Sequence, residues 1–482
     1  MTKKINLFAN LKSDFSSGLV VFLVALPLCL GIALASGAPL FSGIISGVVG
    51  GIVVGYLSQS HLSVSGPAAG LTVIVLNGIT TLGSYDQFLV AVAIAGVLQI
   101  VLGYLKAGVI GYYFPSSVIK GMLAAIGIIL ILKQLPIAIG YNKAAAQSYH
   151  MGSIIIASIS IGIILFWEMP MLKKYAFFKY VPGALIAVLV GVALNLFFNT
   201  NMPAWALSAD ALVKLPVAKN STEFIGQFTL PNFSALGNYQ VYVVAITIAI
   251  IASLESLLST EAADKLDPYK RVTPTNRELK AQGLGNIVSG LIGGLPVTQV
   301  IVRSSANINF GGKSKLSTIM HGFFLLFSAI FIAGLLNLIP LASLAAILLM
   351  VGYKLAKPSL FQQMYKLGWE QFIPFTATVV AIIATDLLKG ITVGILFGIF
   401  YTLRHSYRNS HYVKDNVSDQ NGKTVHHLVL AEEVSFFNKA SLLSTFESFP
   451  NNSKVIIDCT NSKSIAYDVI EIIKDFELNA KT

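Results

Sequence analysis

The hydrophobic pattern of this chain is a series of long apolar runs separated by short polar stretches. Runs close to about 20 residues can cross a bilayer, and no soluble core needs so many of them. The pattern therefore predicts an all-α polytopic protein of the lipid bilayer. We distinguish fourteen transmembrane segments, two of them broken, near 17–36, 40–57, 66–80, 87–105, 116–138, 151–167, 181–199, 239–260, 280–294, 303–312, 316–338, 340–356, 370–388 and 391–407.

One of the broken segments lies within 283–315, where a helix of small residues stops at 293–296. An extended β-branched run over 297–302 follows, and the sequence predicts that the helix restarts at Arg303. Lipid tolerates non-helical backbone only where protein or a water-filled cavity satisfies its polar groups. The amides of a restarted helix favour anions, and Arg303 adds a full positive charge. The alternative interpretation is a kinked packing helix whose arginine reaches a lipid headgroup.

A second stretch, 61–75, repeats this pattern with a short β-like run, the breaker Ser65-Gly66-Pro67 and a small-residue helix start. Gly66 and Ser304 lie 304 − 66 = 238 positions apart, close to half of the 482 residues. Interrupted segments at corresponding places in two halves indicate a transporter's binding site. We therefore expect two facing half-helices that form an anion site in the middle of the membrane.

The polar stretch 200–238 divides the membrane region into two sets of seven segments, about 14–199 and 239–408, which follow a short tail over 1–13. Composition agrees with a membrane protein, because 55% of residues are hydrophobic and only 11% are charged, against about a quarter in soluble domains. The apolar run 18–35 is long enough to span, so we expect a first membrane segment there and not a cleavable signal.

The net charge of +11 would suit a nucleic-acid partner, but the basic residues are distributed as in a membrane protein. With the N-terminus in the cytoplasm, most lysines and arginines fall on inside faces. This asymmetry is the positive-inside signature. It predicts a multi-pass protein of the cell's inner (plasma) membrane with both termini cytoplasmic and no nucleic-acid partner. The basic residues left outside are few: Lys133, Lys143, Lys214, Lys219 and Lys389.

Glu255 follows a long apolar run that begins at Tyr239, and a carboxylate inside a membrane segment is a functional hypothesis by default. Ser259 lies one helical turn further on, on the same face. Together the two side chains could bind a sodium ion or carry a coupling proton. The alternative is that Glu255 pairs with a lysine near the cytoplasmic end. Cys29 and Cys459 have no partner spacing, so neither a disulfide framework, a metal site nor another cofactor is expected.

From about residue 409 the composition becomes that of a soluble domain. Strands are expected over 426–434 and 454–459, the second of them buried, and helices over 440–446 and 466–476. This alternation predicts a small α/β domain. The polar stretch 405–423 is expected to join it to the membrane region.

The chain resembles the sulfate permease (SulP) family of inorganic-anion transporters over essentially its whole length. The motifs that carry the resemblance are Ala25-Leu26-Pro27, Ala35-Ser36-Gly37, Ser65-Gly66-Pro67, the stretch NRELKAQGLGN at 276–286 and the stretch GGLPVT at 293–298.

This resemblance implies a seven-plus-seven inverted repeat, a cytoplasmic STAS-like domain over 409–482 and a homodimer. It implies that the anion is bound by Gly66, Pro67 and Ala68 on one side and by Val302, Arg303 and Ser304 on the other. Glu255 and Ser259 match positions that serve a coupling ion in some members.

The chain also departs from the family pattern. Leu28 and Ile32 stand where some relatives have a glutamine and an aromatic residue, and Val302 replaces a frequent serine. The STAS-like region ends at Thr482 after its second expected helix, so we expect a truncated domain.

The function that these observations favour is secondary active transport of an inorganic anion, of the sulfate or bicarbonate class, by alternating access. A proton-coupled carboxylate or nucleobase carrier of the same architecture is an alternative. A membrane-anchored STAS signalling scaffold is another, although a scaffold has no use for two broken helices. An enzyme is not expected, since the sequence has no nucleophile motif, metal cluster or nucleotide loop.

Overall fold

The computed structural model describes residues 10–109, 115–141, 149–175, 177–178, 181–217, 220–385, 387–418, 424–450 and 453–479. Within these ranges, each apolar segment predicted from the sequence contains a helix, although the segment at 66–80 begins in a strand and the segment at 316–338 forms two helices. Seven of the described helices are long and apolar enough to cross a membrane, and four more apolar helices have 10–17 residues. The chain is therefore a multi-pass membrane protein, while the full count of fourteen spans stays a prediction.

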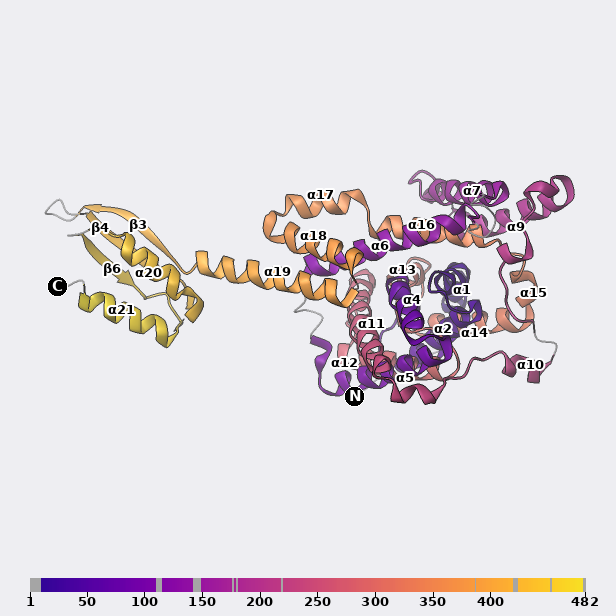
Figure 1. Ribbon diagram of the computed structural model, residues 1–482, viewed down its shortest axis with the longest axis horizontal. Coiled ribbons are helices and arrows are strands. Elements are labelled where there is room, and N and C mark those ends of the chain that lie inside the picture. The colour runs from indigo at the N-terminus through magenta and orange to yellow at the C-terminus, as the bar shows by residue number, and fades with distance from the viewer. Residues whose placement is uncertain are drawn as a thin grey trace.

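The membrane helices form two groups within the helical body, and in Figure 1 helices α6, α7, α16 and α18 lie above α1, α2, α5 and α14. In the first group α5 packs on α11 and α12, while α1 packs on α2, α13 and α14. In the second group α6 packs on α16 and α18, and α7 packs on α9 and α16. The two groups meet mainly where α1 contacts α16 and α9. The first group comprises α1 (Leu11–Ala35), α2 (Leu40–Val49), α4 (Thr72–Leu82), α5 (Tyr85–Tyr104), α11 (Tyr239–Leu266), α12 (Thr275–Leu291), α13 (Ile301–Asn309) and α14 (Leu316–Phe331).

The second group comprises α6 (Ser116–Ala138), α7 (Met151–Trp167), α9 (Gly183–Asn201), α16 (Leu341–Leu355), α18 (Trp369–Ala384) and α19 (Leu387–Arg408). The short helices α15 (Ala333–Leu336) and α17 (Pro358–Lys366) connect neighbours, and α10 (Ser221–Gly226) lies in the polar stretch between the two halves. We call the side on which α1 begins at Leu11 and α19 ends at Arg408 the terminal face. Contacts between distant segments gather there, such as that between Ser13 and Gly311.

Glycines allow the helices of the first group to approach closely. After Val49 the second segment widens into a π-helical turn, Gly50–Val54, and ends as α3 (Gly55–Leu57). A Cβ added at Gly51 would lie 2.6 Å from the Cα atom of Gly322 on α14. Because no real side chain tolerates that distance, this contact between α14 and the second segment depends on glycine.

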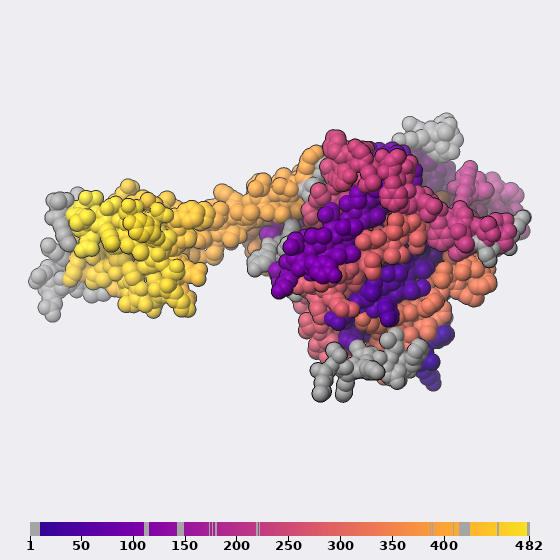
Figure 2. Space-filling view, turned by 90° about the horizontal axis from the view of Figure 1, so that it is seen from below, coloured from indigo at the N-terminus to yellow at the C-terminus, as the bar shows by residue number. Residues whose placement is uncertain are grey.

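The C-terminal domain extends from the helical body at the end of α19, as Figures 1 and 2 show. Its sheet has the order β3-β4-β6, with β3 (His411–Ser418) antiparallel and β6 (Lys454–Asp458) parallel to β4 (Thr424–Leu430). The short strands β5 (Glu433–Val434) and β7 (Ser464–Ile465) pair separately. Leu428, Leu442 and Val469 are among the residues of a small core beneath helices α20 (Lys439–Ser448) and α21 (Tyr467–Asn479).

Within the joining stretch 405–423, the described residues continue α19 to Arg408 and then form β3. Two sequence predictions are wrong in detail. The strand 454–459 is not fully buried: β6 is an edge strand, and the side chain of Ile456 is 39% exposed. The strand expected over 426–434 is divided into β4 and β5.

Candidate functional site

The two breaks predicted from the sequence lie side by side in the structure. Residues Ser65–Pro67 form β1, which pairs antiparallel with β2, Val297–Gln299, so that Gly66 lies opposite Thr298. The Asn286 side chain of α12 holds the same backbone, accepting a hydrogen bond from the Val297 amide at 2.6 Å and donating to the Val297 carbonyl at 3.0 Å. The protein itself thus satisfies the non-helical backbone, as a membrane interior requires.

The second half-helix starts two residues earlier than predicted, because α13 begins at Ile301 instead of Arg303. Ser304 stabilises this start from inside: its hydroxyl donates to the Val300 carbonyl at 2.8 Å and accepts from the Val64 amide at 3.0 Å. The Ser304 side chain therefore joins the two broken segments. Because Val64 precedes β1, this bond also ties the two halves of the chain together.

Arg303 is completely buried between the two breaks, at 0% exposure. Its Nη2 atom donates to the Pro67 carbonyl at 3.4 Å, while its Nε and Nη1 atoms have no partner among the described residues. The guanidinium fills the space that a side chain at position 66 would need, which explains why glycine stands there. None of the ion pairs found among the described residues involves Arg303. A buried charge without a counter-ion is costly, so this site favours an anion.

Two residues beside Arg303 were missed by sequence reasoning. Cys29 on α1 is buried and forms a side-chain contact with the guanidinium, and His321 on α14 is buried in its electrostatic field. Neither position carries a local sequence signal, because each is a single polar residue within an apolar helix. Only the packing of α1 on α13, and of α14 on α1, brings them to the site.

A cavity of about 410 Å³ lies between the two helix groups. One face of α13 lines it over the whole length of the half-helix, from Val302 at the start to Asn309 and Phe310 at the end. Opposite, the cavity is lined by α7, the beginning of α9 and α16. The side chain of Val302 is 51% exposed, whereas Arg303 and Ser304 are buried. Of the six predicted anion-binding residues, Val302 alone is among the residues that line this cavity.

The first half-helix begins behind β1 with a 3₁₀ turn, Ala69–Leu71, that continues into α4. Gly66, Pro67 and Ala68 are all buried. The carboxylate of Glu255 contacts the backbone of Gly70, and a Cβ added at that glycine would lie 2.5 Å from its Oε1 atom. The Oε2 atom of Glu255 is buried without a hydrogen-bond partner in the described part of the chain. Glu255 therefore belongs to the site, where it faces the start of the first half-helix.

Ser259 is buried one turn beyond Glu255 on α11. Two other hydroxyls of α11, on either side of Ser259, hold β2. Ser256 accepts from the Gln299 amide at 3.2 Å, and Thr260 donates to the Gln299 side chain at 2.5 Å. Sequence reasoning did not single out this pair, because serine and threonine within a helix carry little signal on their own.

A further buried carboxylate lies on α12, where Glu278 has 0% exposure. Ser58 donates a hydrogen bond to it, and Gln282 donates both to it at 2.7 Å and to Ser65 of β1 at 2.8 Å. This chain of polar contacts connects the end of α3 to the break in the third segment. Glu278 lies in the NRELKAQGLGN stretch, so the family motif contains it, although no role was predicted for it.

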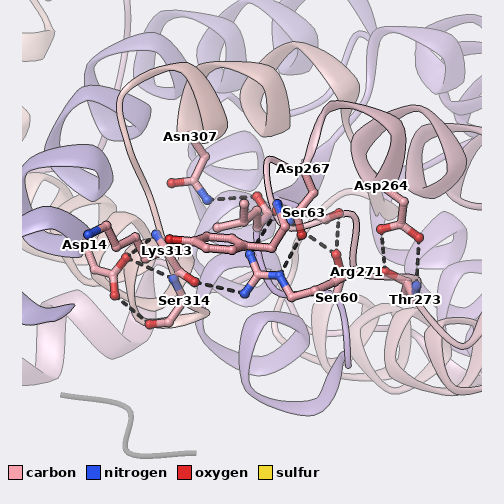
Figure 3. A network of polar contacts seen from close by, with 12 residues as sticks. Asp14, Ser60, Ser63, Asp264, Asp267, Arg271, Thr273, Asn307, Lys313 and Ser314 are labelled. Carbon is pink, nitrogen blue, oxygen red and sulfur yellow. Dashed lines mark hydrogen bonds and ion pairs between the residues drawn. The ribbon is translucent and has the colours of Figure 1, made fainter. Parts of the chain in front are cut away.

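A polar network at the terminal face fixes the far end of α13, as Figure 3 shows. Asn307 donates to the Leu62 carbonyl at 2.8 Å and accepts from Ser17 of α1 at 2.7 Å. Asp14 accepts from the Lys313 amide at 2.7 Å and from Ser314. The N-terminal helix α1 and the segment before β1 therefore hold the C-terminal end of α13, which keeps the start of this half-helix in place at the site.

Beyond α11, the same network contains an ion pair between Arg271 and Asp267 with a shortest contact of 2.6 Å. Burial works against ionisation of Asp267, but the hydrogen bonds from Arg271 and the Tyr269 amide outweigh it and hold the pKa of this carboxyl below its usual range. Arg271 also donates to the Lys313 carbonyl at 3.1 Å. The loop after α11 is thereby attached to the end of the second half-helix.

Two half-helices that start beside each other at a paired break, within a multi-pass helical bundle, define the protein as a transporter with broken helices. The model of the sulfate permease family matches residues 11–378. The chain therefore belongs to the sulfate permease family, and it is an anion transporter rather than an enzyme.

Individual relatives agree with this assignment. The chain is 28% identical over 399 residues to a putative sulfate transporter, YvdB, of Bacillus subtilis, an alignment that covers 80% of this chain and 72% of the relative. It is similar to the transmembrane domain of a cyanobacterial bicarbonate transporter, BicA, with a TM-score of 0.70 and 26% identity, covering 80% of this chain and 98% of that one. A mouse anion transporter, Slc26a9, shares the fold over 100% of this chain and 85% of its own, with a TM-score of 0.79 and 14% identity.

Proposed function

We propose that this protein is a secondary active transporter of an inorganic anion of the sulfate or bicarbonate class. The observation that carries the proposal is Arg303, a completely buried cation whose Nε and Nη1 atoms lack partners in the described part of the chain. It lies where two half-helices begin, and the amides there favour a negative charge. A transported anion would supply the missing counter-charge.

In this proposal the anion is bound between the starts of the two half-helices, at Ala68 and Val302. Val302 faces the cavity, so its amide would be in direct contact with the anion, whereas Arg303 would act from behind through its electrostatic field. Gly66 and Pro67 leave room for the guanidinium and accept its hydrogen bond. Ser304 would hold the two half-helices in register.

We further propose that Glu255, with Ser259, binds the coupling ion, either sodium or a proton. An ionised carboxylate beside an anion site repels the anion, so a cation or proton at Glu255 would strengthen anion binding. The Oε2 atom of Glu255, which has no hydrogen-bond partner in the described part of the chain, supports this proposal. This arrangement would make the affinities for the two ions interdependent.

For the whole protein, we propose a tail over 1–13, a transport domain over 14–408 built as an inverted repeat, and a STAS-like domain over 409–482. The transport domain would cross the plasma membrane fourteen times with both termini cytoplasmic, so that the terminal face lies in the cytoplasm. Alternating access would be a rocking of the α1 group of helices against the α6 group around the fixed site. A homodimer is the expected assembly.

The proposal is tested by reconstituting the protein in liposomes and measuring uptake of labelled sulfate, bicarbonate and a dicarboxylate. Arg303→Ala should weaken binding of the transported anion by roughly 2 kcal/mol, the interaction of two unit charges about 8 Å apart at an effective dielectric constant near 20. Arg303→Lys is the matched control, because it keeps the charge. Unchanged affinity in the alanine variant would contradict the assignment of the site, and a preference for the dicarboxylate would favour a carboxylate carrier.

A further inference from the structure

The cavity beside α13 has two charged residues among the described residues that line it, Glu168 and Lys354. The other lining residues are apolar or neutral, among them Ser305 and Asn309 of α13. Arg303 is buried behind the cavity wall and does not line it. An anion in this cavity would therefore meet the Glu168 and Lys354 side chains without another charge among the described lining residues.

The cavity reaches Asn309 and Phe310 at the far end of α13, which the polar network of the terminal face holds, and its two charged residues lie at helix ends. Lys354 is in the last turn of α16, and Glu168 immediately follows α7. Along α16, the lining residues Ile347, Met350, Val351 and Lys354 follow one helix face. Seven residues of helix correspond to a rise of about 10 Å, so Lys354 is separated along the cavity from the level of Ile347 by about that distance.

Glu168 and Lys354 form an ion pair with each other, and both side chains remain accessible, at 42% and 46% exposure. A pair as exposed as this stabilises a protein very little, because water screens it. Separating the two side chains is therefore easy. While the pair is closed, the carboxylate cancels the charge that would attract an anion.

We propose that the Glu168–Lys354 pair is an electrostatic gate that sets how readily an anion enters the cavity from the terminal face. Lys354 is the attracting group, and Glu168 limits the attraction by pairing with it. This inference rests on the proposed function, because it concerns the path to the same anion site. It adds two specificity-determining residues that lie on the α6 group of helices, opposite the half-helix α13.

The first experiment measures the charge of the cavity without using transport. Ser305→Cys places a thiol on the cavity wall, in a chain whose exposed Cys459 is replaced by serine. The rates at which a sulfonate-bearing and a trimethylammonium-bearing methanethiosulfonate react with this thiol are then compared. Their ratio cancels differences in the amount of folded protein.

Glu168→Gln should raise the ratio of anionic to cationic reaction rates, and Lys354→Gln should lower it. A unit charge roughly 10 Å from the thiol changes each reaction rate by about two- to tenfold, if the effective dielectric constant lies between that of water and that near a protein surface. Lys357→Gln is the matched control, since Lys357 follows α16 but does not line the cavity. A ratio that stays within twofold in both variants would overturn the proposal.

The second experiment measures uptake of labelled sulfate and bicarbonate by the same two variants without the added cysteine. The KM of the transported anion should fall several-fold in Glu168→Gln and rise several-fold in Lys354→Gln. If the pair only braced α7 against α16, both variants would lose activity in the same direction, which would overturn the gate. If the unmodified protein moves neither anion while the reagent ratio shifts as expected, the proposed transport of these anions fails and the charged entrance still stands.

Discussion

At the scale of single residues, the contact between Gly70 and Glu255 links the anion site to the proposed coupling site. Glu255→Gln removes the ionisable group while keeping its shape. We expect this variant to lose accumulation of anion driven by a sodium or proton gradient, while exchange of anion for anion continues. Both modes are measured in the same vesicles. Full accumulation by the glutamine variant would show that Glu255 has a structural role only.

Gly70→Ala provides a complementary test, because the three atoms nearest to its Cβ would all belong to the Glu255 carboxylate, the closest of them at 2.5 Å. Its expected effect is a shift in dependence on the coupling ion, with anion exchange largely retained. Gly162→Ala is the matched control: this glycine is exposed on α7, and an added Cβ has nothing within 4 Å. An equal loss in both alanine variants would point to a general effect on folding.

His61, in the loop between α3 and β1, should make the stability of the folded protein depend on pH. Burial, together with the nearby cations Arg271 and Lys315, lowers the pKa of its imidazole, and these effects outweigh the carboxylates Asp264 and Asp267. Because the pKa is lower in the folded than in the unfolded protein, the unfolded state binds more protons as the pH falls below the usual value of about 6.5. Stability should therefore decrease from pH 7 towards pH 5.

Thermal unfolding in detergent at a series of pH values measures this effect, with His61→Gln as the comparison. The glutamine variant should show a smaller fall in Tm over the same interval. His411 in the C-terminal domain also has a pKa lowered by burial, so some fall should remain. Equal pH dependence in the two proteins would contradict the role assigned to His61.

At the scale of elements, the membrane region was largely predictable from sequence, because apolar runs report directly on helices that must satisfy their own backbone in lipid. The two breaks were also predictable, since Gly66-Pro67 and Gly293-Gly294-Leu295-Pro296 are strong helix breakers. The pairing of β1 with β2 matches the expectation that the breaks face each other. Polar contacts such as those of Asn286 were not predictable, because they join residues that are close only after the helices have packed.

The same limit applies to the C-terminal domain. Strand β3 was missed because its residues, such as Lys414 and Asp415, are polar and resemble a linker. The edge strand β6 was taken for a buried one because Val455, Ile456 and Ile457 form a continuous apolar run. Composition cannot distinguish a strand buried on both faces from an apolar edge strand, as the exposure of Ile456 shows.

A prediction at this scale concerns Asn286 of α12, which holds strand β2 at the second break. Its side chain bonds to both backbone groups of Val297 and donates to Gln99 at 2.6 Å. Asn286→Ala leaves these buried groups unpaired, at about 1–3 kcal/mol for each. We expect a lower Tm in detergent and weaker anion binding, because β2 precedes the start of α13.

The matched control is Asn201→Ala, which removes an exposed asparagine at the end of α9. It should change neither stability nor affinity by more than about 0.5 kcal/mol, as is usual for surface substitutions. Normal anion affinity in Asn286→Ala, despite reduced stability, would show that the break tolerates the loss of this bond and that the site is positioned by α13 alone.

At the scale of the whole molecule, the proposed site and its supporting network lie entirely within the membrane region. The residues that hold the half-helices come from α1, α11, α12 and the loop before β1. Figure 2 shows the C-terminal domain as a separate mass joined to this region through α19. The chain continues beyond residue 378, where the family match ends, but no described residue of 411–479 lines the cavity beside α13.

We therefore predict that a chain ending at Asn409 inserts, folds and transports its anion. Contacts that the cut would remove include the bond from the Asn438 side chain to the Ser406 carbonyl at 2.9 Å and the bond from the Ala431 amide to the Ser410 carbonyl at 2.9 Å. Both lie at the end of α19, far along the chain from the half-helices. Rocking of one helix group against the other around a fixed site does not require an appended domain to enter that site. The measurement is anion affinity in detergent and uptake in liposomes, and the affinity should match the full chain within a few fold. A shortened protein that is monodisperse yet binds no anion would mean that the C-terminal domain takes part in transport.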